Sequence, residues 1–303
     1  MYLKLIIFLF FSVLAAQNHV ADFHLKGKVR SLESTTYQVS ADSRTGVSGF
    51  LDSEFYDAVS LNFAPDGNLV LRKNFLDYRG KLGLYDQTVY QYNPGNQLEK
   101  QQTTLVQNGE EPTRVSQLKN YYYLGNRPVR MDEFNYGRTT DQSWTINYKY
   151  SLENLTEKEF WMEDQIFSKE IHAYDLTNRL DFVQTVHNNG KPGQRIFFQY
   201  DEQRNLKNKI TETGNEKEQE SFEYERGVLK FRTLSDGNGK IQLRETYFPN
   251  GLPKVVEKIN YARNSFSKYE FKYEFDSQYN WINCLILEDE NPKFRIVRRI
   301  IYY

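Results

Sequence analysis

A short unit made of one aromatic residue, a polar turn with Gly or Asn, and usually an apolar residue recurs nine times along the sequence. The aromatic residues of successive copies stand 24 to 30 residues apart. They are Phe63, Tyr92, Tyr122, Tyr150, Tyr174, Tyr200, Tyr224, Phe248 and Phe275. Such a period indicates copies of one supersecondary unit, each of which buries its apolar face against its neighbours. This repeat constrains the fold more than any other feature of the sequence.

The Gly or Asn of each unit marks a turn, because these residues best tolerate the positive φ that a tight turn between antiparallel strands needs. The expected positive-φ residues are Gly67, Gly95, Gly125, Asn154, Asn178, Asn205, Gly227, Gly251 and Asn280. Between the turns, bulky and polar residues alternate. In residues 268–275, Tyr269, Phe271, Tyr273 and Phe275 alternate with Lys and Glu. Period-two alternation predicts strands with one apolar-aromatic face and one charged face.

These patterns predict an all-β fold, an antiparallel meander of repeated β-hairpins with about 20 strands. The aromatic content of 16% and the mean hydropathy of −0.73 favour the same class. An open twisted sheet rarely holds more than about 10 strands. We therefore expect the array to be curled or folded over into a sandwich or an open-barrel-like single sheet.

Residues 1–16 have the layout of a secretory signal peptide, since Lys4 precedes an apolar run from Leu5 to Leu14 and small residues follow. That run is short for a membrane span, although an uncleaved anchor is the alternative. No membrane span is expected after removal of the signal. The signal peptide predicts an exported bacterial protein, soluble and periplasmic or extracellular. No cysteine follows the small residues, so the protein is not expected to be lipid-anchored. Residues 17–24 are expected to form a short N-terminal segment.

Charge and residue types exclude several kinds of site. The 39 Lys and Arg residues are balanced by 40 Asp and Glu residues, which argues against a nucleic-acid partner. His19, His24, His172 and His187 lack the spacing of metal ligands. Cys284, the single cysteine, lies in an apolar run and is expected to be buried rather than nucleophilic. No catalytic, metal or cofactor-binding residue is predicted, no cofactor is expected, and the binding residues are unknown.

Three further segments have a structural explanation. Asp236–Lys240 lacks the spacing of a phosphate-binding loop and is predicted to be a hairpin turn. The carboxylates at Glu110–Glu111 and at residues 288–290 fall at predicted turns, where solvation is expected instead of glycoside hydrolysis. The rings of the cluster Tyr121–Tyr123 are expected to pack in the core or at its rim, with exposure of one or two of them for contact with a sugar or a partner as the alternative.

Two of the repeat units carry the dipeptides Tyr174-Asp175 and Tyr200-Asp201, and Leu180 and Gly190 follow the first. In these units the chain resembles the RHS/YD-repeat proteins, and its two ends resemble those of small exported relatives from Bacteroidetes-type bacteria that lack a toxin domain. The resemblance implies β-hairpin arrays, here a single YD-repeat-like β domain over residues 25–303. Most copies lack the Tyr-Asp pair, and encapsulation of a toxin is not implied.

The sequence favours a non-enzymatic exported protein that binds or scaffolds through a broad sheet surface, in the cell envelope or outside the cell. A glycan or an envelope protein is the expected partner. Two alternatives stay open, a glycan-acting envelope enzyme and an outer-membrane β-barrel. The barrel needs a lipid-facing band nearly free of charge, whereas Arg295, Arg298 and Arg299 charge both faces of the last strand. Strand edges at Lys28–Tyr37 or Phe294–Tyr303 could pair with a second chain, but no oligomeric state is predicted.

Overall fold

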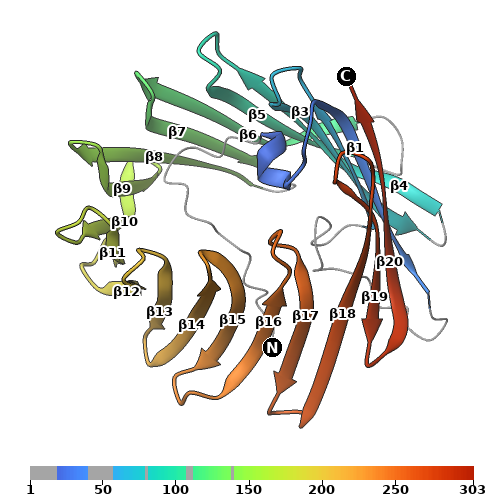
Figure 1. Ribbon diagram of the computed structural model, residues 1–303. Coiled ribbons are helices and arrows are strands. Elements are labelled where there is room, and N and C mark those ends of the chain that lie inside the picture. Colours follow the sequence, from blue (N-terminus) through green and yellow to red (C-terminus); the bar gives the residue numbers. More distant parts are fainter. Residues whose placement is uncertain (1–18, 40–56, 79–80, 107–111, 138–139) are drawn as a thin grey trace. The chain divides into compact units, whose positions relative to one another are not determined.

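Strands and one short 3-10 helix, η1, make up the regular structure of the described chain (Figure 1). The computed structural model describes residues 19–39, 57–78, 81–106, 112–137 and 140–303. The predicted signal peptide and the Glu110–Glu111 pair lie outside these residues. The elements are η1 Val20–Phe23, β1 Val29–Gln38, β2 Ala58–Phe63, β3 Leu69–Tyr78, β4 Lys81–Tyr92, β5 Leu98–Val106, β6 Pro112–Leu124, β7 Arg127–Tyr136, β8 Asp141–Ser151, β9 Asn154–Met162, β10 Gln165–Tyr174, β11 Leu180–His187, β12 Pro192–Tyr200, β13 Leu206–Thr213, β14 Glu216–Glu225, β15 Val228–Asp236, β16 Ile241–Tyr247, β17 Pro253–Asn260, β18 Ser265–Phe275, β19 Trp281–Glu288 and β20 Asn291–Tyr302. Among the described residues, no helix is long and apolar enough to cross a membrane.

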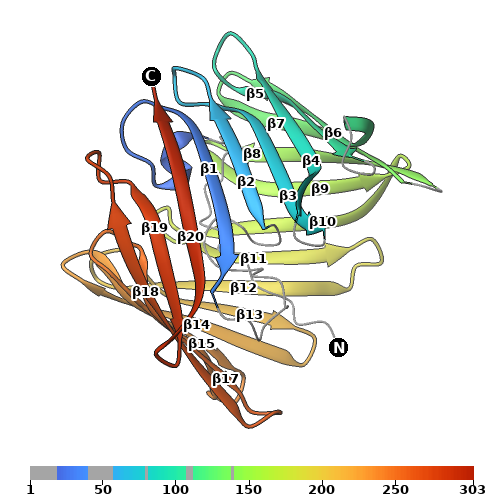
Figure 2. The same cartoon turned by 90° about the vertical axis from the view of Figure 1, so that its right-hand side faces the viewer.

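The strands belong to one 20-stranded sheet in which consecutive strands pair antiparallel, as β9 does with β10 and β13 with β14. The first strand, β1, pairs with β2 on one side and with β20 on the other. Both views show β1 beside β20 (Figures 1 and 2). The sheet is therefore closed in its hydrogen bonding. The expectation of an array curled or folded over into a sandwich or open barrel is wrong.

Closure joins the two ends of the described chain through pairing of β1 with β20. Leu32 lies opposite Ile300, and Thr36 lies opposite Ile296. Leu32 and Ile296 are each 1% exposed. Pairing also satisfies backbone N–H and C=O groups that a free edge would leave open. The edges predicted at Lys28–Tyr37 and Phe294–Tyr303 are thus paired with each other.

The chain divides into two compact units. Unit 1 comprises residues 1–144, 273–285 and 293–303, and unit 2 comprises residues 145–272 and 286–292. Unit 1 contains an apolar core in which Val20 of the predicted N-terminal segment and Leu25, which follows that segment, pack with strand residues such as Leu61. His19 is the N-cap residue of η1, and its ring occupies the space that a Cβ atom on Gly67 would need. This part of the predicted N-terminal segment is therefore integral to the core.

In the repeats that contain Tyr92, Tyr123, Tyr174 and Tyr200, a tyrosine hydroxyl donates a hydrogen bond to a backbone carbonyl oxygen of the preceding repeat. The hydroxyl of Tyr174 donates to the carbonyl oxygen of Leu155 at 3.0 Å. The same bond joins Tyr92 to Leu69 at 3.0 Å, Tyr123 to Leu98 at 2.9 Å and Tyr200 to Leu180 at 2.8 Å. In the Tyr121–Tyr123 cluster, Tyr123 fills this place, not the predicted Tyr122, which is 45% exposed.

The turns follow the prediction in kind but not always in position. Gly67, Gly125, Asn178, Gly227 and Gly251 have the expected positive φ. In three turns the left-handed residue is the neighbour of the predicted one, at Asn96, Arg204 and Tyr279. The turns on Asn68 and Asn96 are joined by a hydrogen bond between the two side chains, as are those on Asn154 and Asn178.

Candidate functional site: charge networks on two faces of unit 2

Arg232 lies at the centre of a buried ion network on one face of unit 2. Its guanidinium donates to Glu220 from Nε at 2.9 Å and from Nη2 at 2.7 Å, and to Glu245 from Nη1 at 2.8 Å. Lys209 Nζ donates to the other Glu220 oxygen at 2.8 Å, and the Tyr247 hydroxyl donates to Glu245 at 2.6 Å. Arg232 is 3% exposed and Glu220 is 6% exposed. We call this surface the Arg232 face.

The pairing of charges decides the protonation of this network. Burial alone would raise the pKa of Glu220, but the hydrogen bond from Lys209 and the charge of Arg232 outweigh it and hold that pKa below its ordinary value. Burial, and then the charge of Glu245, raise the pKa of Tyr247, so its phenol stays protonated. Glu218 behaves in the opposite way to Glu220, because burial and the adjacent Glu220 raise its pKa. The neighbouring carboxyl groups of Glu218 and Glu220 therefore have pKa values shifted in opposite directions.

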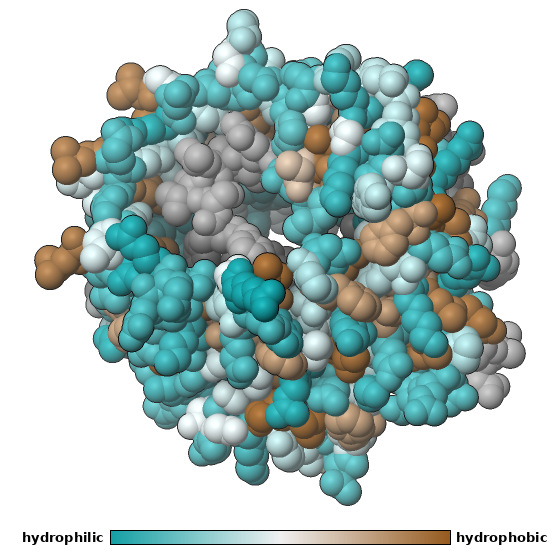
Figure 3. Space-filling view, in the orientation of Figure 1, coloured by the Kyte–Doolittle hydropathy of each residue, from teal (hydrophilic) through white to brown (hydrophobic). Residues whose placement is uncertain are grey.

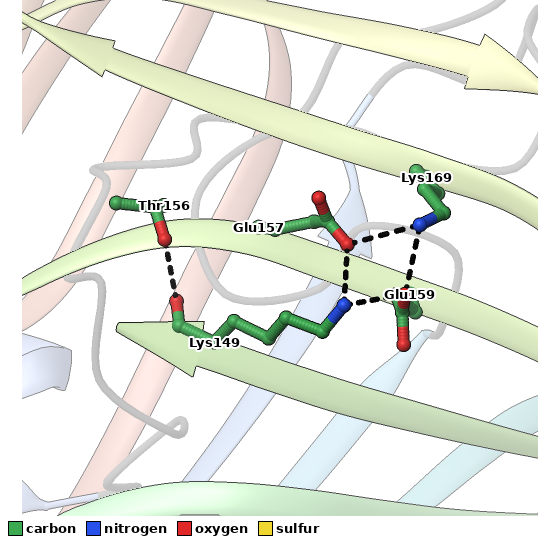
Figure 4. Close-up of polar contacts among 5 residues, drawn as sticks. All are labelled: Lys149, Thr156, Glu157, Glu159 and Lys169. Carbon is green, nitrogen blue, oxygen red and sulfur yellow. Dashed lines mark hydrogen bonds and ion pairs between the residues drawn. The ribbon is translucent and has the colours of Figure 1, made fainter. Parts of the chain in front are cut away.

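A second network lies on the opposite face of unit 2. Lys149 Nζ donates to Glu157 at 2.9 Å and to Glu159 at 2.6 Å, and Lys169 Nζ donates to the same two carboxylates at 3.2 and 2.9 Å (Figure 4). Each lysine thus bridges both glutamates. Thr156 adds a hydrogen bond from its hydroxyl to the Lys149 carbonyl oxygen at 3.2 Å. The hydrogen bond from Lys149, more than any other contact, lowers the pKa of Glu159, to about 2.

Strand alternation places further ion pairs on this second surface, the Glu159 face. Arg244 and Glu257 pair at 3.7 Å. Arg244 directly precedes Glu245, and Glu257 directly precedes Lys258, in strands whose Leu243 and Lys258 lie opposite each other. Adjacent residues of a strand point to opposite faces, so this pair lies on the face opposite Glu245. Lys268 pairs with Glu270 at 2.5 Å on β18. Both faces of unit 2 are therefore charged. The predicted division into one aromatic and one charged face does not describe β13–β16.

The histidines do not form a site together. His172 is buried on β10, with Nε2 3.4 Å from a Glu170 carboxylate oxygen that Lys158 also approaches to 2.7 Å. Burial alone would raise the pKa of Glu170, but His172 and Lys158 lower it to about 2. His24 and His187 are exposed. Within the described ranges, no group of three or more His, Cys, Asp or Glu residues could hold a metal ion.

The remaining sequence candidates lie in structural roles. Cys284 is fully buried on β19, and burial raises the pKa of its thiol to about 12. The Asp236 carboxylate accepts the backbone N–H groups of Asn238 and Lys240, both at 2.9 Å, which closes the predicted hairpin turn. Glu288 accepts a hydrogen bond from the Tyr269 hydroxyl at 2.6 Å. None of these groups is arranged as an activated nucleophile.

No family model matches the sequence, and no curated protein matches it. Solved structures similar to this chain include a porin-like protein from Bacteroides uniformis, at 10% identity over 91% of this chain and 99% of that chain, with a TM-score of 0.39. TcdB2-TccC3 is similar at 10% identity over 77% of this chain and 17% of that one, with a TM-score of 0.32. A porin-like protein from Bacteroides vulgatus is similar at 10% identity over 76% of this chain and 97% of that one, with a TM-score of 0.27. Similarity at this level shows no shared family or activity, so the YD-repeat resemblance depends on the repeated residues alone.

Proposed function

We propose that this chain is a non-enzymatic protein of the cell envelope or the extracellular space, in which a closed β-repeat sheet serves as a rigid scaffold for binding. The observation that carries the proposal is the neutralisation of the buried carboxylates. Glu159, Glu170 and Glu220 are each held by cations that keep the pKa of the carboxyl low. A general acid needs a raised pKa, and a general base needs a carboxylate that is free to accept a proton.

The distribution of charge supports a scaffold surrounded by water. The two faces of unit 2 both carry ion pairs near the middle of strands, at Arg232 on one face and at Arg244 on the other. In unit 1, Arg298 of β20 is 5% exposed and stacks on Trp281 at 3.3 Å, while its neighbour Arg299 is exposed. In the view of Figure 3, hydrophobic residues are scattered among hydrophilic ones.

An outer-membrane β-barrel is a second candidate, and the closed sheet favours it. Bacterial barrels of that class have an even number of antiparallel strands, and this sheet has 20. A charged residue facing lipid at mid-membrane costs roughly 2–4 kcal/mol. Because ion pairs interrupt both faces, we place this candidate after the water-surrounded scaffold.

A glycan-acting enzyme is a third candidate, and Glu218 is the observation that favours it. Two neighbouring carboxyl groups with oppositely shifted pKa values are typical of acid and base partners. Its neighbour Glu220, however, is occupied by Lys209 and Arg232, so it is not available as a nucleophile or base.

One set of measurements separates the three candidates. The exported chain is purified without detergent and applied to a glycan array, to an envelope-protein pull-down and to a panel of glycosidase substrates. The proposal expects a single folded species in detergent-free buffer, saturable binding, and no turnover. A requirement for detergent would favour the barrel. Turnover that Glu218→Gln abolishes would favour the enzyme and would end the proposal.

A further inference from the structure

Tyr279 occupies a turn position at which the fold does not require an aromatic residue. Its φ is +61°, and its side chain is 72% exposed. Other turns at this end of the strands have the same two backbone hydrogen bonds as the turn from Asp276 to Asn280. In those turns, the place of Tyr279 is taken by Gly67, Asn96, Asn178, Arg204 and Gly251. A bulky side chain is disfavoured in the left-handed region, and an exposed ring gains little from burial. Among the non-glycine residues with positive φ in the described chain, Tyr279 is the only Tyr, Phe or Trp, and this makes it a candidate for a function.

The turn that carries Tyr279 is rigidly held. The Asp276 carboxylate accepts the backbone N–H groups of Gln278 and Asn280, both at 2.9 Å, and the Tyr302 hydroxyl donates to it. The Asn280 side chain is 2% exposed and pairs with the backbone of Lys26, accepting its N–H at 2.7 Å and donating to its carbonyl oxygen at 2.9 Å. These bonds fix the segment around Lys26 beside the turn. A preorganised surface binds a ligand with a smaller entropic cost.

Positive charge lies beside the exposed ring. Lys26 Nζ lies 5.6 Å from the centroid of the Tyr279 ring, and Lys28 is exposed two residues further along. The backbone N–H of Tyr303 donates to the Lys28 carbonyl oxygen at 2.9 Å, and the Tyr303 side chain is 54% exposed. Asp276, the acid of this turn, is already occupied by its hydrogen bonds. All of these residues belong to unit 1.

We propose that Tyr279, Lys26 and Lys28 form a binding site for an acidic glycan. The aromatic face stacks on the apolar face of a sugar ring, and the two ammonium groups pair with its carboxylate or sulfate groups. The positive charge at this site distinguishes the ligand from a neutral glycan. The inference rests on the proposed binding function and names the chemical class of the ligand.

The test uses the exported full-length chain with polygalacturonate, its carboxyl-reduced neutral form, and poly-L-glutamate, measured by calorimetry. The expected result is binding of polygalacturonate alone. Tyr279→Gly should weaken this binding about tenfold, equivalent to about 1.4 kcal/mol. Lys26→Gln and Lys28→Gln should weaken it and reduce its dependence on salt. Because glycine suits a φ of +61°, Tyr279→Gly should not lower the thermal midpoint.

Tyr261 provides the matched control, because it is also an exposed tyrosine, at 52%, with a lysine, Lys240, 5.4 Å from its ring. Tyr261→Gly should leave polygalacturonate binding unchanged. The inference is overturned if polygalacturonate does not bind, if poly-L-glutamate binds equally well, or if Tyr279→Gly binds like the unaltered protein. If the glycan array shows another ligand that binds without Tyr279, the proposed function stands and this site does not.

Discussion

Replacing Arg232 with leucine removes a cation that pairs with both Glu220 and Glu245. Breaking a buried ion pair by deleting one partner costs roughly 3–5 kcal/mol, since the remaining charge is left uncompensated. Lys209 still neutralises Glu220 at 2.8 Å, so we expect a loss near the lower limit, about 3 kcal/mol. The carboxylate of Glu245 keeps the hydrogen bond from the Tyr247 hydroxyl and the electrostatic interaction with Lys258.

Urea unfolding followed by far-ultraviolet circular dichroism measures this loss. Arg244→Leu is the control, because its side chain is 50% exposed and its pair with Glu257 spans 3.7 Å. An exposed pair contributes at most about 1 kcal/mol. In the background Glu245→Gln, Arg232→Leu should cost less, by a coupling energy of about 0.5–3 kcal/mol. If Arg232→Leu destabilises the protein no more than Arg244→Leu does, the network contributes no net stability and the reasoning is refuted.

Three other predictions concern the repeat and its charges. The folded-state pKa values of Glu159 and Glu170 are about 2, below the ordinary 4.5, so the stability that these carboxylates contribute is present above pH 4.5 and is lost as the pH falls towards 2. Measurement of the free energy of unfolding against pH should show this loss. Glu170→Gln should make the pH dependence of the free energy of unfolding shallower. Tyr174→Phe should lower stability by about 0.5–1.5 kcal/mol by deleting its bond to Leu155, whereas Tyr261→Phe should have no measurable effect in the same urea titration. Gly67→Ala should lower the thermal midpoint more than Gly251→Ala does. Both glycines have positive φ, but of the two only Gly67 lies under the His19 ring. Equal shifts of the thermal midpoint would contradict the packing of His19.

The sequence predicts the local structure well, because that structure depends on near neighbours. Positive φ at Gly67, Asn178 and Gly251 follows from turn chemistry, and burial of Phe271 follows from period-two alternation on β18. Even here a turn can select the residue next to the predicted one. Tyr279 instead of Asn280 takes the left-handed conformation, as Arg204 does instead of Asn205, because both turns have the same backbone hydrogen bonds.

The closure of the sheet and the charge network could not be predicted from near neighbours in the sequence. The pairing of Leu32 with Ile300 joins opposite ends of the described chain, and nothing in the pattern of either strand identifies the other as its partner. The residues Lys209, Glu220, Arg232 and Glu245 come from four consecutive strands, and each looks like an ordinary solvent-facing charge in its own segment. The regular spacing of charges at the middle of successive strands was the signal that could have indicated the network.

Closure by β1 and β20 is the central claim, and a disulfide across that pair tests it most directly. Thr35 lies opposite Val297 in the register of these strands. In a Cys284→Ser background, cysteines at positions 35 and 297 should form an intramolecular disulfide under mild oxidation, in a monomer that keeps its sheet content. Failure to cross-link, or cross-linking only between two chains, would contradict the closed sheet.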